Sequence, residues 1–244
     1  MRTHILGVVA ALLLPITLVL LPKDADALLC GPGAHWVDGC AGGLDIFPST
    51  AVVGIDFDFD NIADVTVILN GPSMVKRFEP SDDSSNFPGL APLDDHRDVI
   101  DVELVSLTLT GGMVSITAGA GPSPGGVSLA PSMGSILEQV GDSTLADSFF
   151  DVFFEVEIVG GGFLYNQTPL RIEAIDLPGV PPEGRTYIHP PGPIPLFASL
   201  IGGDPVAQLI SASHTVVPEP GAALLVALGL AGGAAARRRL QLNP

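Results

Sequence analysis

Three aspartates alternate with apolar residues in the segment Ile-Asp-Phe-Asp-Phe-Asp at residues 55–60. Strand side chains point alternately to two faces, so a strand here would project Asp56, Asp58 and Asp60 from one face, about 7 Å apart. Carboxylate oxygens are the ligands that calcium prefers, at about 2.3–2.6 Å. The same pattern is typical of a solvated strand face. Calcium is therefore the one cofactor that the sequence suggests, with these three aspartates as candidate ligands.

A serine in a G-x-S-x-G string, Gly121-Pro-Ser123-Pro-Gly125, has the spacing of the nucleophile turn of many hydrolases. That turn needs a strand before the serine and a helix after it, whereas prolines flank Ser123 on both sides. Ser123 is therefore predicted to lie in an ordinary loop, and the sequence predicts no catalytic residue. A structural zinc or iron site is not expected either, because no two of these histidines have a spacing such as H-x-x-x-H: His35, His96, His189 and His214.

Two other kinds of ligand chemistry stay open as alternatives. Paired carboxylates serve glycoside hydrolysis when a cleft holds them roughly 5 to 10 Å apart, which sequence cannot place. One tryptophan and two tyrosines offer few stacking surfaces for sugars. A glycan- or calcium-binding module is the main alternative to a non-enzymatic role, and a carboxylate-dependent hydrolase is the less favoured one.

The two cysteines, Cys30 and Cys40, have nine residues between them. In an exported protein such a pair is most simply a disulfide that closes a small loop, with a metal pair or free thiols as alternatives. The loop-entropy model gives it about 2 to 3 kcal/mol. We expect it to support the N-terminal loop alone.

Short apolar runs between turn residues are expected to position these groups. The runs alternate with period 2, and paired glycines at residues 111–112 and 160–162 predict hairpins between them. They lie at residues 55–59, 63–69, 73–78, 99–110, 113–118, 149–158, 170–175 and 206–216. Since no ten-residue amphipathic helix stands out, the sequence predicts a single all-β domain, an antiparallel sandwich or jelly roll.

Charge excludes one class of partner. Between residues 28 and 220 there are 25 acidic residues, all of the 27 except Asp24 and Asp26, against five basic ones. A surface this acidic repels the phosphate backbone, so nucleic acid is not a partner.

The apolar surplus lies at the two ends of the chain. Residues 5–21 form an apolar run followed by Ala25 and Ala27 at signal-peptidase spacing, so residues 1–27 are predicted to be a cleaved signal-peptide helix. An uncleaved anchor and a lipoprotein are the alternatives; Pro15 and Pro22 disfavour the first, and the leucine before Cys30 the second. The protein is therefore expected to be exported.

The C-terminal end has three parts in a fixed order: Pro218-Glu219-Pro220, an apolar stretch at 222–236, and Arg237, Arg238 and Arg239. As a helix the stretch would measure about 22 Å, short against a hydrocarbon core of about 30 Å. The arginines favour a cytoplasmic C-terminus. We predict a short transmembrane helix that anchors the chain transiently in the inner membrane.

This tail resembles the PEP-CTERM sorting signal, and the resemblance covers about the last 28 residues. It implies cleavage near the motif by an exosortase-type enzyme and delivery to the cell surface or exopolysaccharide. The expected organisation is thus a signal peptide at 1–27, a secreted β-sandwich domain at 28–216 and a sorting segment at 217–244. The expected protein is a non-enzymatic component of the envelope or extracellular matrix.

Overall fold

The computed structural model describes residues 30–81 and 97–218, and within them every regular element is a β-strand. The strands are β1 (Gly43–Asp56), β2 (Val65–Arg77), β3 (Val99–Gly111), β4 (Val114–Ala118), β5 (Gly121–Pro122), β6 (Ser128–Leu129), β7 (Ser132–Gln139), β8 (Asp142–Val152), β9 (Phe154–Ile158), β10 (Gly162–Asn166), β11 (Leu170–Leu177), β12 (Thr186–Ile188), β13 (Ile194–Phe197) and β14 (Pro205–Val216). The predicted all-β antiparallel fold is confirmed. The helices expected at the two ends of the chain lie outside the described residues.

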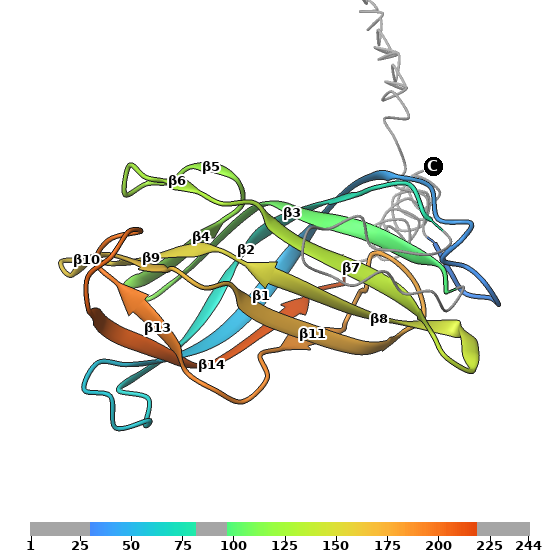
Figure 1. Cartoon of the computed structure of the whole chain (residues 1–244). Coiled ribbons are helices and arrows are strands. Elements are labelled where there is room, and N and C mark those ends of the chain that lie inside the picture. The colour runs from blue at the N-terminus through green and yellow to red at the C-terminus, as the bar shows by residue number, and fades with distance from the viewer. Residues whose placement is uncertain (1–29, 82–96, 219–244) are drawn as a thin grey trace, which may run out of the picture.

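Twelve of these strands form one antiparallel sheet, in the order β1-β2-β3-β4-β9-β10-β13-β14-β12-β11-β8-β7, while β5 and β6 form a separate hairpin. Two further pairings, of β1 with β14 and of β3 with β7, close the large sheet on itself. Figure 1 shows two facing walls, with β7 and β8 in front of β1 and β2. The two layers expected of a sandwich are present, and hydrogen-bonded strand pairs join them.

The hydrophobic core lies between these walls because the strands alternate inward and outward side chains. In β1 the inward set includes Phe47, Ala51, Val53 and Ile55, all less than a tenth exposed. Burial of a large aliphatic or aromatic side chain contributes about 1.5–3 kcal/mol. The alternation therefore fixes the register of β1 against both of its neighbours, since a slip by one residue would turn this set to solvent.

The run predicted as one strand at 149–158 is two strands, β8 and β9, with Phe153 between them. The side chain of Asn166 causes this break in the ladder. Its Oδ1 accepts a hydrogen bond from the Phe154 N–H at 2.7 Å, and its Nδ2 donates to the Val152 carbonyl at 2.8 Å. The same face points inward on both sides of the break, since Phe150, Val152, Phe154 and Val156 are buried.

Both predicted hairpins are confirmed, with Gly111 opposite Val114 and Gly162 opposite Ile158. Gly112 turns the first of them with a φ of +60°, a conformation that glycine adopts without steric cost. The proline-dense segment at residues 178–195 contributes β12 and the start of β13. Both strands pair with β14, so this segment is part of the closed sheet.

Candidate functional site

The candidate calcium ligands lie at the end of β1 and on the loop at residues 57–64 that joins β1 to β2. Asp56 is the last residue of β1 and is fully buried, whereas Asp58 and Asp60 are exposed. One carboxylate oxygen from each lies within 4.8 Å of the others. The structure thus brings the three predicted ligands together, as a cation site requires.

The expected geometry, however, was wrong. Residues 57–59 are not in a strand, and Phe57 and Phe59 are 40% and 42% exposed instead of facing the core. The reason is that aspartate side chains compete with the strand ladder for backbone N–H groups. Asp56 Oδ1 accepts hydrogen bonds from the N–H groups of Asp58 and Phe59, at 3.0 and 2.8 Å, and this bends the chain.

The other carboxylates of the loop repeat this turn. Asp58 Oδ1 accepts from the Asp60 N–H at 3.3 Å, and Asp60 Oδ1 accepts from the Ile62 N–H at 2.7 Å. Asp64 closes the loop, because its Oδ2 accepts from the Phe57 N–H at 2.7 Å. The sequence therefore folds the loop through its own aspartates. Asp58, Asp60 and Asp64 each keep an oxygen that accepts no backbone hydrogen bond. Both oxygens of Asp56 accept one, since its Oδ2 accepts from the Asn61 N–H at 2.8 Å.

The pKa values of Asp56 and Asp58 are shifted in opposite directions. Burial raises the pKa of Asp56, but the hydrogen bond from Gln208 and those from the backbone outweigh it and leave the pKa lowered. At Asp58 a backbone hydrogen bond from Asp60 lowers the pKa, yet burial and the charges of Asp60 and Asp64 outweigh it and raise the pKa. Asp58 thus lies among like charges, a position that a bound cation would favour.

Two residues of this loop were missed by the sequence analysis. With Asp56 counted as position 1, Asn61 is position 6 and Asp64 is position 9. Asn61 has a φ of +67°. Calcium loops of the EF-hand type place oxygen ligands at positions 1, 3, 5 and 9 and a glycine at position 6, where the chain turns sharply. Position 12, a bidentate glutamate in those loops, is Val67 here. The spacing D-x-D-x-D-N-x-x-D was the signal that could have identified both residues.

Ser123 of the G-x-S-x-G string is a structural anchor. Its hydroxyl donates to the carboxylate of Glu155, which is 1% exposed, and the Gly125 N–H donates to the same carboxylate at 3.0 and 3.1 Å. Burial and the charge of Glu155 raise the pKa of Tyr165, which also bonds to it. The four groups hold the β5–β6 hairpin against β9 and β10, and a helix does not follow the serine.

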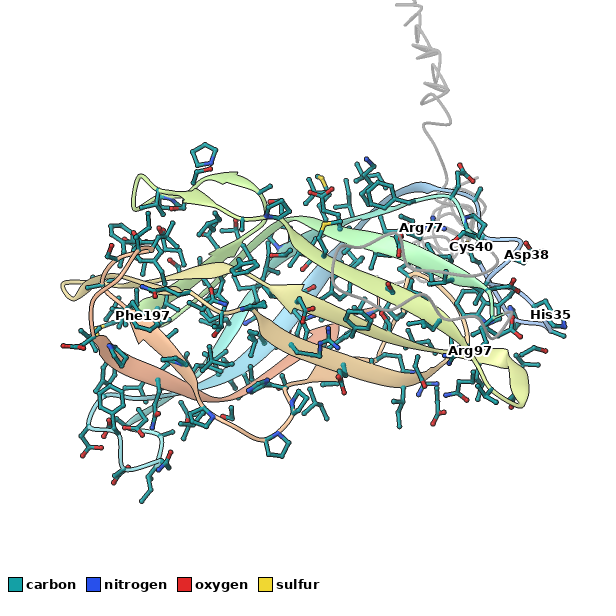
Figure 2. All side chains as sticks on the ribbon, in the orientation of Figure 1. His35, Asp38, Cys40, Arg77, Arg97 and Phe197 are labelled. Carbon is teal, nitrogen blue, oxygen red and sulfur yellow. A yellow bond between two sulfur atoms is a disulfide. The ribbon has the colours of Figure 1, made fainter. Side chains whose placement is uncertain are left out.

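The predicted disulfide is present and joins Cys30 to Cys40. Its role is wider than support of the N-terminal loop alone. The guanidinium of Arg77, on β2, faces both sulfur atoms and is paired with Asp45 of β1. Cys30 also forms a β-bridge with Val180. The disulfide therefore ties the loop to the ends of β1 and β2 and to the segment that follows β11. Figure 2 shows Cys40 beside Arg77.

The predicted sorting residues begin where the fold ends. β14 stops at Val216, the Val217 N–H donates to the Pro48 carbonyl at 2.9 Å, and Pro218 is exposed. The signal peptide, Glu219, Pro220 and Arg237 to Arg239 lie outside the described residues. Within residues 30–81 and 97–218 there is no helix long and apolar enough to cross a membrane.

The fold resembles a solved structure of low sequence identity. DynF, from the dynemicin biosynthesis pathway of Micromonospora chersina, is 17% identical, with a TM-score of 0.57, over 81% of this chain and 88% of that one. At this identity the likeness concerns the fold alone. No curated protein matches the chain by sequence.

The tail matches a family model. Residues 216–239 fit the PEP-CTERM protein-sorting motif, which spans the Pro-Glu-Pro triplet, the apolar stretch and the arginines. This match begins at the last residue of β14, so the motif follows the closed sheet without an intervening linker. The chain therefore carries a PEP-CTERM sorting motif and is an exported protein that an exosortase-type enzyme processes at the cell envelope.

Proposed function

We propose that this protein is a non-enzymatic component of the cell envelope or extracellular matrix, and that its closed sheet is a calcium-binding module. The observation that carries the proposal is the β1–β2 loop, where Asp56, Asp58 and Asp60 present oxygens within 4.8 Å of one another. Asp64 adds a fourth carboxylate to the same loop. A ligand set made wholly of oxygen suits a hard cation such as calcium.

The loop fits a weak site of the extracellular kind. Such modules bind calcium with dissociation constants of about 10⁻⁴–10⁻³ M, and affinity falls as charged ligands are lost. Val67 stands where a bidentate glutamate would complete the set, so we place this loop in that weak class.

The interior of the closed sheet supports the non-enzymatic part of the proposal. A cavity of about 80 Å³ lies between the walls and is lined almost wholly by apolar side chains. Its one carboxylate is that of Asp45, which the Arg77 guanidinium engages through two hydrogen bonds. A carboxylate-dependent hydrolase would need at least two acidic groups free to act on a substrate.

In this proposal the C-terminal tail directs the domain to the cell surface. The apolar stretch at residues 222–236 anchors the chain transiently in the inner membrane, and Arg237 to Arg239 keep the C-terminus cytoplasmic. After cleavage near Glu219 the domain is released to the surface, where exopolysaccharide is the partner that we propose.

Thermal unfolding with and without calcium tests the module. Calcium at ten times its dissociation constant should stabilise the folded protein by about 1.4 kcal/mol and raise its Tm. The double variant Asp58→Asn, Asp60→Asn should lose this rise. Asp204→Asn, an exposed carboxylate outside the loop, should keep it. Equal calcium responses in the double variant and the wild type would contradict the proposal.

A glycan-binding module is the second candidate, favoured by the exposed rings of Phe57 and Phe59 on the same loop. The tryptophan and both tyrosines are buried, so these phenylalanines are the aromatic surface that a sugar would meet there. A pulldown on isolated cell-surface polysaccharide tests this candidate. Binding that survives replacement of both phenylalanines by alanine would argue against it.

A further inference from the structure

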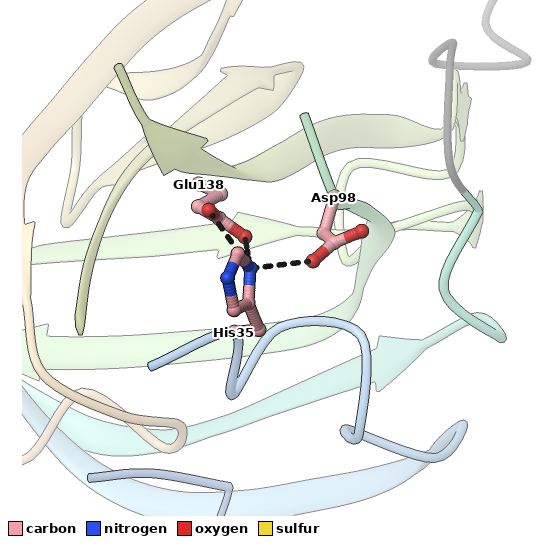
Figure 3. A group of neighbouring side chains, drawn as sticks. All are labelled: His35, Asp98 and Glu138. Carbon is pink, nitrogen blue, oxygen red and sulfur yellow. Dashed lines mark hydrogen bonds and ion pairs between the residues drawn. The ribbon is translucent and has the colours of Figure 1, made fainter. Parts of the chain in front are cut away.

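A second group of metal-ligating side chains lies at the other end of the molecule. His35, Asp98 and Glu138 come from the disulfide loop, the residue before β3 and the end of β7, and they converge as Figure 3 shows. His35 Nδ1 lies 3.3 Å from Glu138 Oε1 and 3.9 Å from Asp98 Oδ2. One ligand atom from each residue lies within 4.8 Å of the other two. Figure 2 places His35 at the end opposite the β1–β2 loop, so the two groups are separate.

The main chain holds this group in place independently of the three side chains. The His35 N–H donates to the Ser143 carbonyl at 2.9 Å, and the Glu138 N–H donates to the Asp98 carbonyl at 2.9 Å. Trp36 Nε1 donates to the Thr144 carbonyl at 3.1 Å, which fixes the disulfide loop against the start of β8. His35 has a φ of +56°, a left-handed conformation that the loop imposes on it. The imidazole is therefore positioned before any ion arrives.

The carboxylate of Glu138 is short of partners. Its side chain is only 10% exposed, and among the described residues the imidazole of His35 is the one group that interacts with it. Buried carboxylates usually accept several hydrogen bonds, because an ionised group that is poorly solvated is costly. Asp98 brings a second negative charge to the same imidazole. A divalent cation at this point would neutralise the buried Glu138 carboxylate.

We propose that His35, Asp98 and Glu138 bind a divalent transition-metal ion, with zinc as the fitting example. Zinc binds imidazole nitrogen and carboxylate oxygen at about 2.0–2.2 Å in a tetrahedron, so neighbouring ligand atoms lie roughly 3.3–3.5 Å apart. The observed 3.3 Å matches this edge, and the 3.9 Å would close by a small rotation of Asp98. Three protein ligands leave the fourth position to water, on the side where His35 is 68% exposed.

The imidazole nitrogen gives this site a different metal preference from that of the β1–β2 loop. Imidazole suits zinc, cobalt, nickel and copper, whereas calcium takes oxygen ligands. The spacing argument from the sequence did not find the group, because its members lie on three separate segments. The inference does not depend on calcium binding at the loop, and each can fail without the other.

The chain offers its own probe for the test. Its single tryptophan, Trp36, is the neighbour of His35, so a paramagnetic ion at the site should quench its fluorescence. The exported protein, purified with its disulfide formed, is titrated with Co²⁺ in a buffer without chelators. We expect a saturable quench with one Co²⁺ per chain, which Zn²⁺ reverses by displacement and Ca²⁺ does not.

Two variants identify the ligands. His35→Asn keeps a residue that tolerates the left-handed conformation, and Glu138→Gln keeps the side-chain volume. Each should weaken Co²⁺ binding at least ten-fold. His189→Asn, at a histidine whose ring nitrogens bond to the Arg171 and Gly192 carbonyls, is the matched control and should bind as the wild type does.

Absence of a saturable quench in the wild type would overturn the proposal, and so would unchanged Co²⁺ affinity in folded His35→Asn. His35 is exposed, so that variant should remain folded even if Glu138→Gln does not. Loss of Co²⁺ binding in Asp58→Asn together with unchanged binding in His35→Asn would assign the ion to the β1–β2 loop and would also overturn it.

Discussion

Replacement of Arg77 by methionine should destabilise the protein more than most single substitutions. Arg77 and Asp45 are buried, with side chains 1% and 2% exposed. Nε and Nη2 of the guanidinium donate to the two carboxylate oxygens at 2.7 and 3.1 Å, and Nη1 donates to the Ala41 carbonyl at 3.0 Å. Methionine fills a similar volume but leaves the Asp45 carboxylate buried without its partner. Removal of one member of a buried ion pair costs about 3–5 kcal/mol.

The size of this effect makes it measurable by urea unfolding. Domains of this kind have a free energy of unfolding of about 5–15 kcal/mol, so the loss is a large share of the total. With an m-value of about 1–3 kcal/mol/M, the urea midpoint should fall by at least 1 M. Arg185→Met, at a half-buried arginine outside the Asp45–Arg77 pair, serves as the control and should shift the midpoint less.

The double variant Asp45→Leu, Arg77→Met separates the pair from its surroundings. With both charges gone no carboxylate is left unpaired, so the double variant should be more stable than Arg77→Met alone. If Arg77→Met costs less than 1 kcal/mol, or if the double variant is the less stable of the two, the argument from an uncompensated buried charge is refuted.

Three further outcomes follow from other features of the fold. Burial lowers the pKa of His214 to about 4, below the 6.5 of the unfolded chain, so the unfolded chain binds the extra proton between these values. The free energy of unfolding should therefore fall by up to about 3 kcal/mol from pH 6.5 to pH 4, and His214→Phe should flatten that slope in urea titrations. Glu155→Ala should cost about 1–3 kcal/mol, because Ser123 and Gly125 lose a buried acceptor, and hydrogen exchange should rise in the β5–β6 hairpin while other strands stay protected. Deletion of residues 218–244 should leave the sheet folded and exported but no longer retained at the inner membrane, as fractionation and circular dichroism would show; an unfolded product, or one still membrane-bound, would contradict this.

Long alternating runs were the part of the fold that the sequence predicted well. The segments at 99–110 and 206–216 became β3 and β14, because period-2 burial leaves a direct trace in residue order. The first half of β8, from Asp142, was missed since it is mostly polar and small. The strand predicted at 55–59 was wrong beyond Asp56. Aspartates whose side chains bond to the backbone N–H two residues later repeat with period 2, just as the residues on one face of a strand do.

Of the two candidate metal sites, the sequence predicted one and missed the other. Asp56, Asp58 and Asp60 are neighbours in sequence, so their proximity could be expected even though the strand geometry was wrong. His35 and Glu138 are 103 residues apart, and only closure of the sheet brings them within reach. Spacing rules identify ligands that share one element, and they fail for ligands that meet through tertiary structure.

The pairing that closes the sheet has a consequence for export. β1 is the first strand of the described residues and β14 the last, and Ser49 pairs with Val216 across a separation of 167 residues. At about 5–20 residues per second, residue 216 is made roughly 8–33 s after residue 49. Until then β1 can gain β2 on one side while its other edge lacks its partner. An unpaired strand edge is a template for pairing with other strands, and the same final residues that cover this edge lead directly into the sorting motif. The residue that completes the closed sheet is thus also the first residue of the sorting motif.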